Sequence, residues 1–287
     1  MKIAILSGKG GTGKTLLAVN LAAAAMDAGY VDCDVEEPNG HLFFKPDLLE
    51  EEEVTVKIPQ VDDKLCDGCR LCVEFCRYNA LAYSGRLIIF DDICHSCGGC
   101  VLLCPQHALT EQDKTIGKVR RGKSEDVDVI SGIMNSGEAS GVPIIDRLQE
   151  YIEAMDKEEK HVFIDCPPGS SCTVMDSIKN ADYCILVAEP SIFGVHNLEM
   201  VHELVKLFSK DYGVILNKCQ EGENLAEEYC LTNNINILGR IPFDPELGLM
   251  NSNGKIAVRE SAKYHDFFSG LLGTVLKEAK VETTSNP

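Results

Sequence analysis

Eight cysteines in two near-identical motifs constrain this chain more than any other feature. Each motif reads Cys-x2-Cys-x2-Cys-x3-Cys, and the second begins 28 residues after the first. In this spacing, three closely spaced cysteines hold one iron–sulfur cluster and the fourth ligates the neighbouring cluster. One predicted [4Fe–4S] cluster is therefore ligated by Cys66, Cys69, Cys72 and Cys104, and the other by Cys94, Cys97, Cys100 and Cys76.

A pair of structural zinc sites is the alternative for these cysteines. Zinc sites usually place paired cysteines on two separate knuckles, with about a dozen or more residues between the pairs. The two motifs do not have that arrangement. Their repeat also extends past the ligands, because Asn79-Ala80-Leu81 follows Cys76 just as His107-Ala108-Leu109 follows Cys104. We therefore expect a small α+β domain of the bacterial ferredoxin type with two clusters.

A glycine-rich loop near the N-terminus is the second strong motif. The apolar run 3–7 has the length of a strand, and the apolar stretch Leu16–Met26 has that of a helix. Glycines let backbone N–H groups turn toward phosphates, and a following helix N-terminus adds a positive field. We expect Lys14 to reach the β- and γ-phosphates of ATP and Thr15 to bind Mg²⁺. The segment between strand and helix matches the phosphate-binding motif Gly-x4-Gly-Lys-[Ser/Thr] and reads Gly8-Lys9-Gly10-Gly11-Thr12-Gly13-Lys14-Thr15.

Further motifs resemble those of the deviant Walker A ATPases, the group of MinD, ParA, Mrp and the nitrogenase iron protein. Lys9, directly after the first glycine of the loop, is the additional lysine of that group. Together with the cysteine insertion, nearly the whole chain resembles MinD-superfamily ATPases that contain an inserted ferredoxin domain. The remaining matches are the first switch (Val31-Asp32-Cys33-Asp34), the second switch (162–169), a base-reading asparagine (Asn217) and a loop at the adenine (238–244).

This resemblance implies an Mg²⁺-dependent ATPase that is slow without its partner. Asp34 would orient the attacking water, and Asp165 would hold Mg²⁺ through water. ATP would join two copies of the chain, with Lys9 of each copy neutralising charge on the phosphates of the other; a solvated surface charge is the alternative for Lys9. A redox or iron–sulfur partner protein is also expected. The nucleotide base would be bound by Asn217, Pro242, Phe243 and Asp244.

Charge and hydropathy narrow the classes of partner and location. The formal net charge is −18, with an acidic run at Glu50–Glu53, which argues against nucleic acid or an anionic membrane as partner. No apolar run approaches the ~18–20 residues that span a bilayer. The start Met1-Lys2-Ile3 leads directly into the phosphate loop, so we expect no signal peptide. The fourteen cysteines, read as thiols, fit a reducing, cytoplasmic compartment.

The pattern of apolar runs predicts an α/β fold. Short continuous apolar runs that alternate with helical stretches indicate a doubly wound, mostly parallel sheet forming a P-loop NTPase core. The expected division is 1–59 for the first part of this core, 60–114 for the ferredoxin insertion and 115–287 for the second part. Expected strands are 162–165, 184–188, 212–217 and 235–241, with helices near 143–156, 197–209 and 223–231 and a final helix around 267–276 docked on the core.

The segment after the first helix does not fit this pattern easily. If that helix ends near Gly29, only Tyr30 and Val31 precede Asp32, whereas a buried strand usually needs about five residues. Either this strand is short, or a few residues are absent from the sequence.

The cysteines outside the motifs are expected to be structural. Cys33 and Cys166 adjoin the two switches, where small buried residues are common. Cys172 follows the second switch, where cysteines of the nitrogenase iron protein hold a cluster between subunits, but no second ligand accompanies it here.

Three functional classes are compatible with these motifs. The first is an ATPase in which nucleotide state is coupled to electron transfer or cluster delivery through the two clusters. The second is an iron–sulfur carrier or maturation ATPase of the Mrp kind. The third is a positioning ATPase of the MinD kind, whose ferredoxin part binds partners. Redox-active clusters favour the first class.

Overall fold

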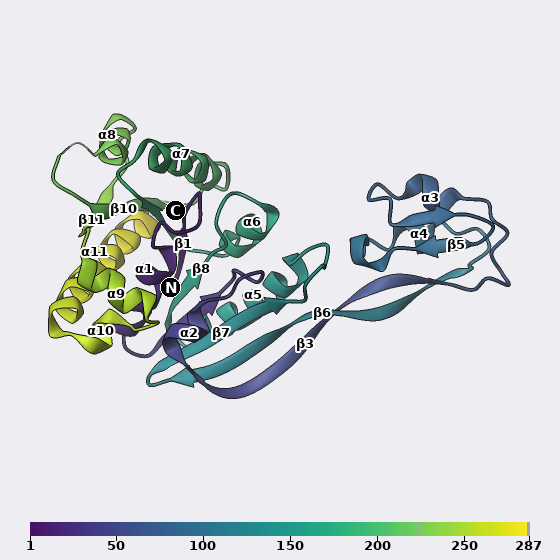
Figure 1. Cartoon of the computed structure of the whole chain (residues 1–287), viewed down its shortest axis with the longest axis horizontal. Coiled ribbons are helices and arrows are strands. Elements are labelled where there is room, and N and C mark those ends of the chain that lie inside the picture. Colours follow the sequence, from purple (N-terminus) through teal and green to yellow (C-terminus); the bar gives the residue numbers. More distant parts are fainter. Residues whose placement is uncertain (223, 286–287) are drawn as a thin grey trace.

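A nine-stranded sheet forms the centre of the computed structural model, which describes residues 1–222 and 224–285 (Figure 1). Its strand order is β11-β10-β9-β1-β8-β2-β7-β6-β3. Neighbours from β11 to β7 run parallel, and the pairs β7–β6 and β6–β3 run antiparallel. The strands of this sheet are β1 (Lys2–Leu6), β2 (Ala28–Asp32), β3 (Asp47–Val61), β6 (Leu109–Ser124), β7 (Val127–Met134), β8 (His161–Asp165), β9 (Tyr183–Ala188), β10 (Tyr212–Cys219) and β11 (Ile237–Pro242).

Helices cover both faces of the sheet, and each face has its own apolar core. One core joins the sheet to α5, α6, α7 and α8, and the other joins it to α1, α2, α9, α10 and α11. The central strands are buried on both sides, which explains their continuous apolar runs. The helices are α1 (Lys14–Ala24), α2 (Gly40–Phe44), α5 (Val142–Lys157), α6 (Cys172–Ile178), α7 (Ile192–Leu207), α8 (Leu225–Thr232), α9 (Pro245–Ser252), α10 (Ala257–Glu260) and α11 (Ala262–Ser285).

The predicted α/β core with a mostly parallel sheet is confirmed. The expected strands correspond to β8, β9, β10 and β11, and the expected helices to α5, α7 and α8. The first residue of the range expected for α8, 223, lies outside the described residues. The final helix packs on the core through Phe268 and Val275, both fully buried.

The strand after the first helix is longer than expected. Helix α1 ends at Ala24 rather than near Gly29, so Ala28 and Gly29 belong to the five-residue strand β2. Met26 and Asp27 make the reversal with left-handed backbone, at φ values of 46° and 50°. Three residues therefore suffice as the connection, and β2 has the usual length of a buried strand.

Two long strands carry the chain out of the sheet. Strands β3 and β6 pair from Asp47 to Val61 and form a two-stranded arm that extends well beyond the core (Figure 1). The expected domain limits at 60 and 114 fall inside these strands. The acidic run lies on β3, where Glu51 accepts a hydrogen bond from Arg120 on β6 at 2.6 Å. Basic side chains from later in the chain thus offset the negative charge of this run.

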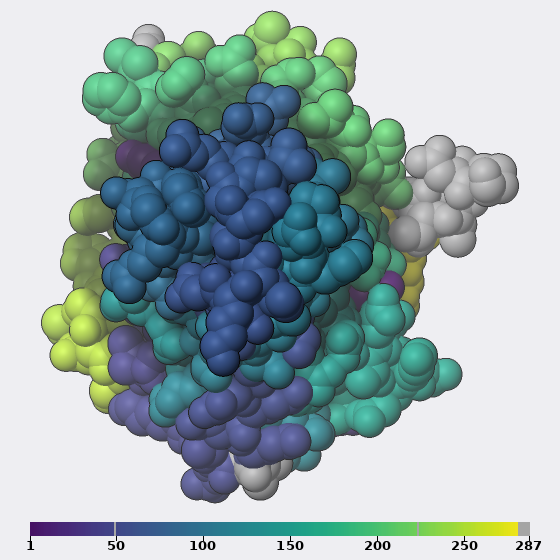
Figure 2. Space-filling model, turned by 90° about the vertical axis from the view of Figure 1, so that its right-hand side faces the viewer, coloured from purple at the N-terminus to yellow at the C-terminus, as the bar shows by residue number. Residues whose placement is uncertain are grey.

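Residues 62–108, which we call the cysteine lobe, lie at the far end of the arm. Seen along the arm, the lobe stands in front of the core (Figure 2). Strands β4 and β5 pair antiparallel, and the helices are a single turn or little more. The elements of the lobe are α3 (Leu71–Phe75), β4 (Leu81–Tyr83), β5 (Leu87–Ile89), the 3₁₀ helix η1 (Asp91–Ile93) and α4 (Gly99–Leu102).

Candidate functional site

The glycine-rich loop lies between β1 and α1, at the carboxyl end of the parallel strands. It borders a cavity of about 670 Å³, which is within the usual range for a small-molecule or cofactor site. Gly11 and Gly13 have φ values of 78° and 95°, a region in which a side chain would be strained. Besides Gly10–Leu16 of the loop and helix, the cavity is lined by Ser7, Lys9, Asp34, Glu37, Asn39, Leu42, Phe43, Pro168 and residues 251–254.

Lys14 is held beneath this cavity by a buried ion pair. Its Nζ lies 2.6 Å from Oδ1 of Asp165, whose Oδ2 accepts a hydrogen bond from the Tyr30 hydroxyl at 2.9 Å. Burial by itself lowers the pKa of Lys14, but the Asp165 carboxylate raises it above its ordinary value. Burial and the same carboxylate raise the pKa of Tyr30, so the phenol stays a neutral donor. Tyr30 therefore orients Asp165, a role that the sequence did not reveal.

The two aspartates of the first switch have different surroundings. Asp32 is buried, and its Oδ2 accepts hydrogen bonds from the backbone of Asn39 at 2.9 Å and Gly40 at 2.8 Å. Burial, and then the charge of Asp165, raise the pKa of Asp32 to about 7. Asp34 is partly exposed and lines the cavity, and burial raises its pKa as well. Asp32 thus fixes the segment between β2 and α2, while Asp34 faces the space in which a phosphate and water would lie.

Lys9 turns toward another residue of its own chain. Its Nζ is paired with Oε1 of Glu189, and Nζ of Lys218 lies 3.3 Å from Oε2 of the same carboxylate. Burial opposes the charge of Glu189, yet hydrogen bonds from the two lysines hold its pKa below its ordinary value. Neither Glu189 nor Lys218 was predicted. Glu189 follows β9, and only the pairing of β9 with β1 brings it to the loop.

The residues expected at the base fall into two groups. Asn217 is buried against the loop, and its side-chain amide donates to the Thr12 carbonyl at 2.6 Å. Asp244 is the N-cap of α9 and also accepts from Lys263 and Tyr264, which together hold its pKa at about 2. Asp244 therefore has a structural task at this helix. Residues 251–254, at the end of α9 and directly after it, form part of the cavity wall.

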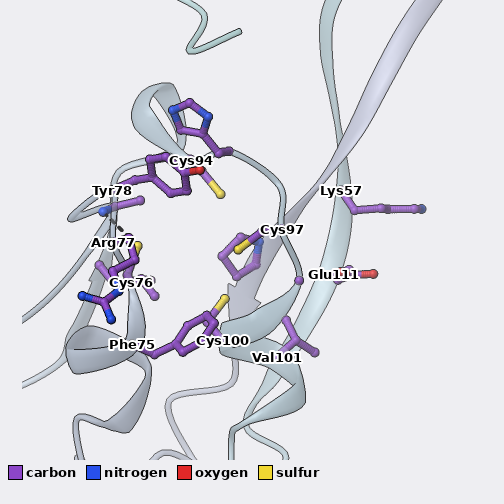
Figure 3. Close-up of a pocket in the computed structure, with 15 residues that line it drawn as sticks. Lys57, Phe75, Cys76, Arg77, Tyr78, Cys94, Cys97, Cys100, Val101 and Glu111 are labelled. Carbon is purple, nitrogen blue, oxygen red and sulfur yellow. Dashed lines mark hydrogen bonds between the residues drawn. The ribbon is translucent and has the colours of Figure 1, made fainter. Parts of the chain in front are cut away.

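The eight motif cysteines gather around two cavities of the cysteine lobe. Figure 3 shows one of them, with the sulfur atoms of its cysteines turned toward a common space. The grouping crosses between the motifs. One cavity is lined by Cys76, Cys94, Cys97 and Cys100, and the other by Cys66, Cys69, Cys72 and Cys104.

The backbone of the lobe repeats with the same offset as the cysteines. The backbone N–H of Ala80 donates to Sγ of Cys76 at 3.3 Å, and that of Ala108 donates to Sγ of Cys104 at 3.3 Å. Helices α3 and α4 begin at matching positions, Leu71 and Gly99. Positive φ values recur at the pairs Gly68 and Ser96, Arg70 and Gly98, and Asn79 and His107.

The strand pairing repeats as well. Leu81 of β4 lies opposite Ile89 of β5, and Leu109 of β6 lies opposite Val61 of β3. The lobe is thus two copies of one supersecondary unit, each giving three cysteines to one cavity and one cysteine to the other. Within the described residues, however, no three Cys, His, Asp or Glu side chains are positioned to hold a single metal ion.

One lysine links the lobe, the arm and the core. Nζ of Lys114, on β6, lies 2.8 Å from Glu138 in the loop between β7 and α5, and 3.2 Å from Asp92 in η1 of the lobe. Met134, the last residue of β7, lies four residues before Glu138. Its backbone N–H donates at 2.8 Å to the carbonyl of Val35, the residue that follows Asp34. Contacts therefore run from the first switch to the segment that precedes Cys94.

The cysteines outside the two motifs differ in their exposure. Cys33 and Cys166 are fully buried in the core. Cys172 is exposed at the start of α6 and lines a cavity of about 500 Å³ that also includes Cys94 and Lys114. Among the helices of the described chain, none is both long and apolar enough to cross a bilayer.

Comparison with known proteins identifies the nucleotide-binding part. Residues 3–258 match the family of CobQ/CobB/MinD/ParA nucleotide-binding domains. A protein of unassigned function from Methanocaldococcus jannaschii is 30% identical over 223 residues, which cover 76% of this chain and 80% of that one. An iron–sulfur cluster carrier protein of Methanococcus maripaludis is 23% identical, with 98% of this chain and 86% of the carrier covered.

Solved structures share the fold. The septum site-determining protein MinD of Pyrococcus horikoshii, complexed with Mg-ADP, superposes with a TM-score of 0.58 and 21% identity, covering 97% of both chains. The cell division ATPase MinD of Pyrococcus furiosus gives a TM-score of 0.59 and 20% identity, covering 96% of this chain and 98% of that one.

Proposed function

The chain belongs to the CobQ/CobB/MinD/ParA nucleotide-binding family and is an ATPase of the MinD/ParA type, and we propose that it couples ATP turnover to two iron–sulfur clusters held in the cysteine lobe. The observation that carries this proposal is the repeat within the lobe. Two copies of one backbone unit bring the cysteines together in two sets of four, grouped as cross-ligation between two clusters requires.

The nucleotide part of the proposal assigns a task to each residue at the cavity. Lys14 leaves Asp165 and binds the β- and γ-phosphates, where its charge offsets the charge of the transferred group. Thr15 and Asp165 would hold Mg²⁺, which supplies further neutralisation when bound. Asp34, at the cavity wall, orients the attacking water.

ATP would also join two subunits in this proposal. Lys9 lines the cavity, but its Nζ is paired with Glu189, which is not part of the cavity wall. In a face-to-face dimer Lys9 would reach the phosphates of the partner. Asn217 would read the base, and Pro242 and Phe243 would lie beside it, with Asp244 holding this turn at the start of α9.

The clusters have two candidate uses. The similarity to an iron–sulfur cluster carrier over 98% of the chain favours cluster delivery, which the comparisons support better than electron transfer. The cysteine sets favour electron transfer, because each set of four comes from a single chain and could hold a resident cluster without a partner. The likeness to MinD structures concerns the fold alone, so positioning remains the weaker candidate.

Anaerobic protein with its clusters intact tests this proposal and separates the two uses. We expect eight iron atoms per chain and a shift of at least one cluster potential on addition of MgATP, absent in Lys14→Ala. Delivery predicts that clusters pass to an apo-acceptor protein in an ATP-dependent manner. Electron transfer predicts that both clusters stay with the chain through many redox cycles. Potentials that are insensitive to MgATP, together with no transfer, would contradict any coupling.

A further inference from the structure

Glu189 is the counter-ion that keeps Lys9 within its own subunit. Its carboxylate is mostly buried, with 16% of the side chain exposed, and it lies between Lys9 and Lys218. The backbone around Glu189 leaves it little freedom. A side chain at Gly194 would collide with the Glu189 carbonyl at 2.0 Å, and Ser191 caps α7 by accepting from Gly194 at 2.9 Å.

Lys218 connects this carboxylate to the other end of the phosphate loop. Its Nζ donates to the Gly11 carbonyl at 2.7 Å, and its backbone has a left-handed φ of 57°. The preceding residue, Asn217, donates to Thr12 and accepts from the backbone N–H of Lys218 at 2.9 Å. A continuous set of contacts therefore joins Lys9, through Glu189 and Lys218, to Gly11 at the other end of the phosphate loop.

We propose that Glu189 is a positioning residue that competes with the partner subunit's phosphates for Lys9, and so sets how tightly two ATP-bound subunits associate. The inference rests on the dimer of the proposed function. Lys9 has one ammonium group and cannot remain on Glu189 while it extends into a second subunit. Both Lys9–Glu189 pairs must therefore open each time a dimer forms, and Lys218 remains to balance the released carboxylate.

The competition makes opposite predictions for the two neighbours of Lys9. Glu189→Gln removes the competing charge, so the dimer should become tighter. Lys218→Met removes the balancing charge, so Glu189 should hold Lys9 more strongly and the dimer should become weaker. A merely structural role for Glu189 would not produce effects of opposite sign.

The test is sedimentation equilibrium at saturating MgATP in the Asp34→Ala background, which slows hydrolysis. We expect Glu189→Gln to lower the dimer dissociation constant roughly threefold to thirtyfold, since two partly exposed ion pairs no longer have to open. The difference should shrink at high salt, which screens the pair. Glu203→Gln is the matched control, because Glu203 pairs with Lys206 on the exposed side of α7, the helix that follows Glu189 in the chain.

Three outcomes decide the matter. If Glu189→Gln associates no more tightly than Glu203→Gln while Lys9→Ala still abolishes the dimer, the role of Glu189 is wrong and the dimer stands. If Glu189→Gln weakens the dimer, Glu189 supports the interface and the competition is likewise wrong. If Lys9→Ala has no effect on association, the proposed dimer itself fails.

Discussion

The core and the cysteine lobe of this chain are stabilised by different means. The core buries long apolar runs on both faces of its sheet, and its largest fully buried side chains include Tyr30, Phe163 and Phe268. Among residues 62–108 the buried apolar side chains are fewer and mostly small, namely Ala80, Leu81, Leu87, Cys100 and Ala108. A unit smaller than about 70 residues rarely folds on so little apolar burial without a metal or disulfides. The core is thus specified by its apolar pattern, whereas the lobe would depend on the clusters of the proposed function.

The largest expected effect is loss of the lobe when its clusters are removed. Cys66→Ala and Cys104→Ala should each remove the first cluster. Cys94→Ala and Cys76→Ala should each remove the second cluster, because ligation crosses between the motifs. Hydrogen exchange should then show residues 62–108 unprotected while the β1 and β8 amides stay protected. Full protection of the lobe in metal-free protein would contradict this difference, and stoichiometric zinc in place of iron would contradict the clusters.

Lys14→Ala should abolish ATP binding and leave the lobe intact. It removes a buried cation at the phosphates, which is worth at least about a hundredfold in affinity. Asp34→Ala should keep ATP affinity and lower turnover about a hundredfold, because its task is to position water. Calorimetry and iron content measure both effects. Unchanged ATP affinity in Lys14→Ala would remove the phosphate-loop assignment.

Substitution of one buried leucine in each region should have smaller effects, confined to the region that contains it. Leu148 on α5 is fully buried, so Leu148→Ala should cost the core about 2–5 kcal/mol of unfolding free energy. Leu81→Ala should leave the unfolding midpoint of the core unchanged and speed the loss of iron from the lobe. Denaturant melts and iron-release kinetics check this pair. A shift of the core midpoint in Leu81→Ala would mean that the regions unfold as one unit.

The sequence was sufficient for features that are local. The phosphate loop and the central strands follow from short motifs and apolar runs. The acidic run Glu50–Glu53 gave no sign of a strand, because its partners Arg120 and Arg147 come from β6 and α5. A strand stabilised by distant charges has no local apolar pattern to read.

The candidate site was harder to predict where it depends on strand order. Glu189 meets Lys9 only because β9 lies beside β1, and Tyr30 meets Asp165 only because β2 lies beside β8. The end of α1 at Ala24 was also missed, because the alanine run continues to Ala25. The left-handed position after the helix is occupied by Met26 rather than by the glycine that usually marks a helix end.

The smallest expected effect concerns the link between the two regions. Lys114 is bonded to Glu138 of the core and Asp92 of the lobe, and only 15% of its side chain is exposed. Although burial opposes its charge, the bonds to these carboxylates raise the pKa of Lys114. Lys114→Met keeps the length of the side chain and should cost only about 1 kcal/mol of stability. ATP affinity and iron content should stay as in the unaltered protein.

What Lys114→Met should change is communication between the regions. If nucleotide-driven movement of Asp34 and Val35 passes through the β7–α5 loop to Glu138, then MgATP should alter hydrogen exchange at residues 91–97 in the unaltered protein, and much less in Lys114→Met. Lys118→Met is the control, because Lys118 pairs with Glu51 between the same two strands, β6 and β3, but contacts neither Glu138 nor Asp92. An equal response to MgATP in both variants would mean that the core and the lobe communicate by another route, or through the partner subunit.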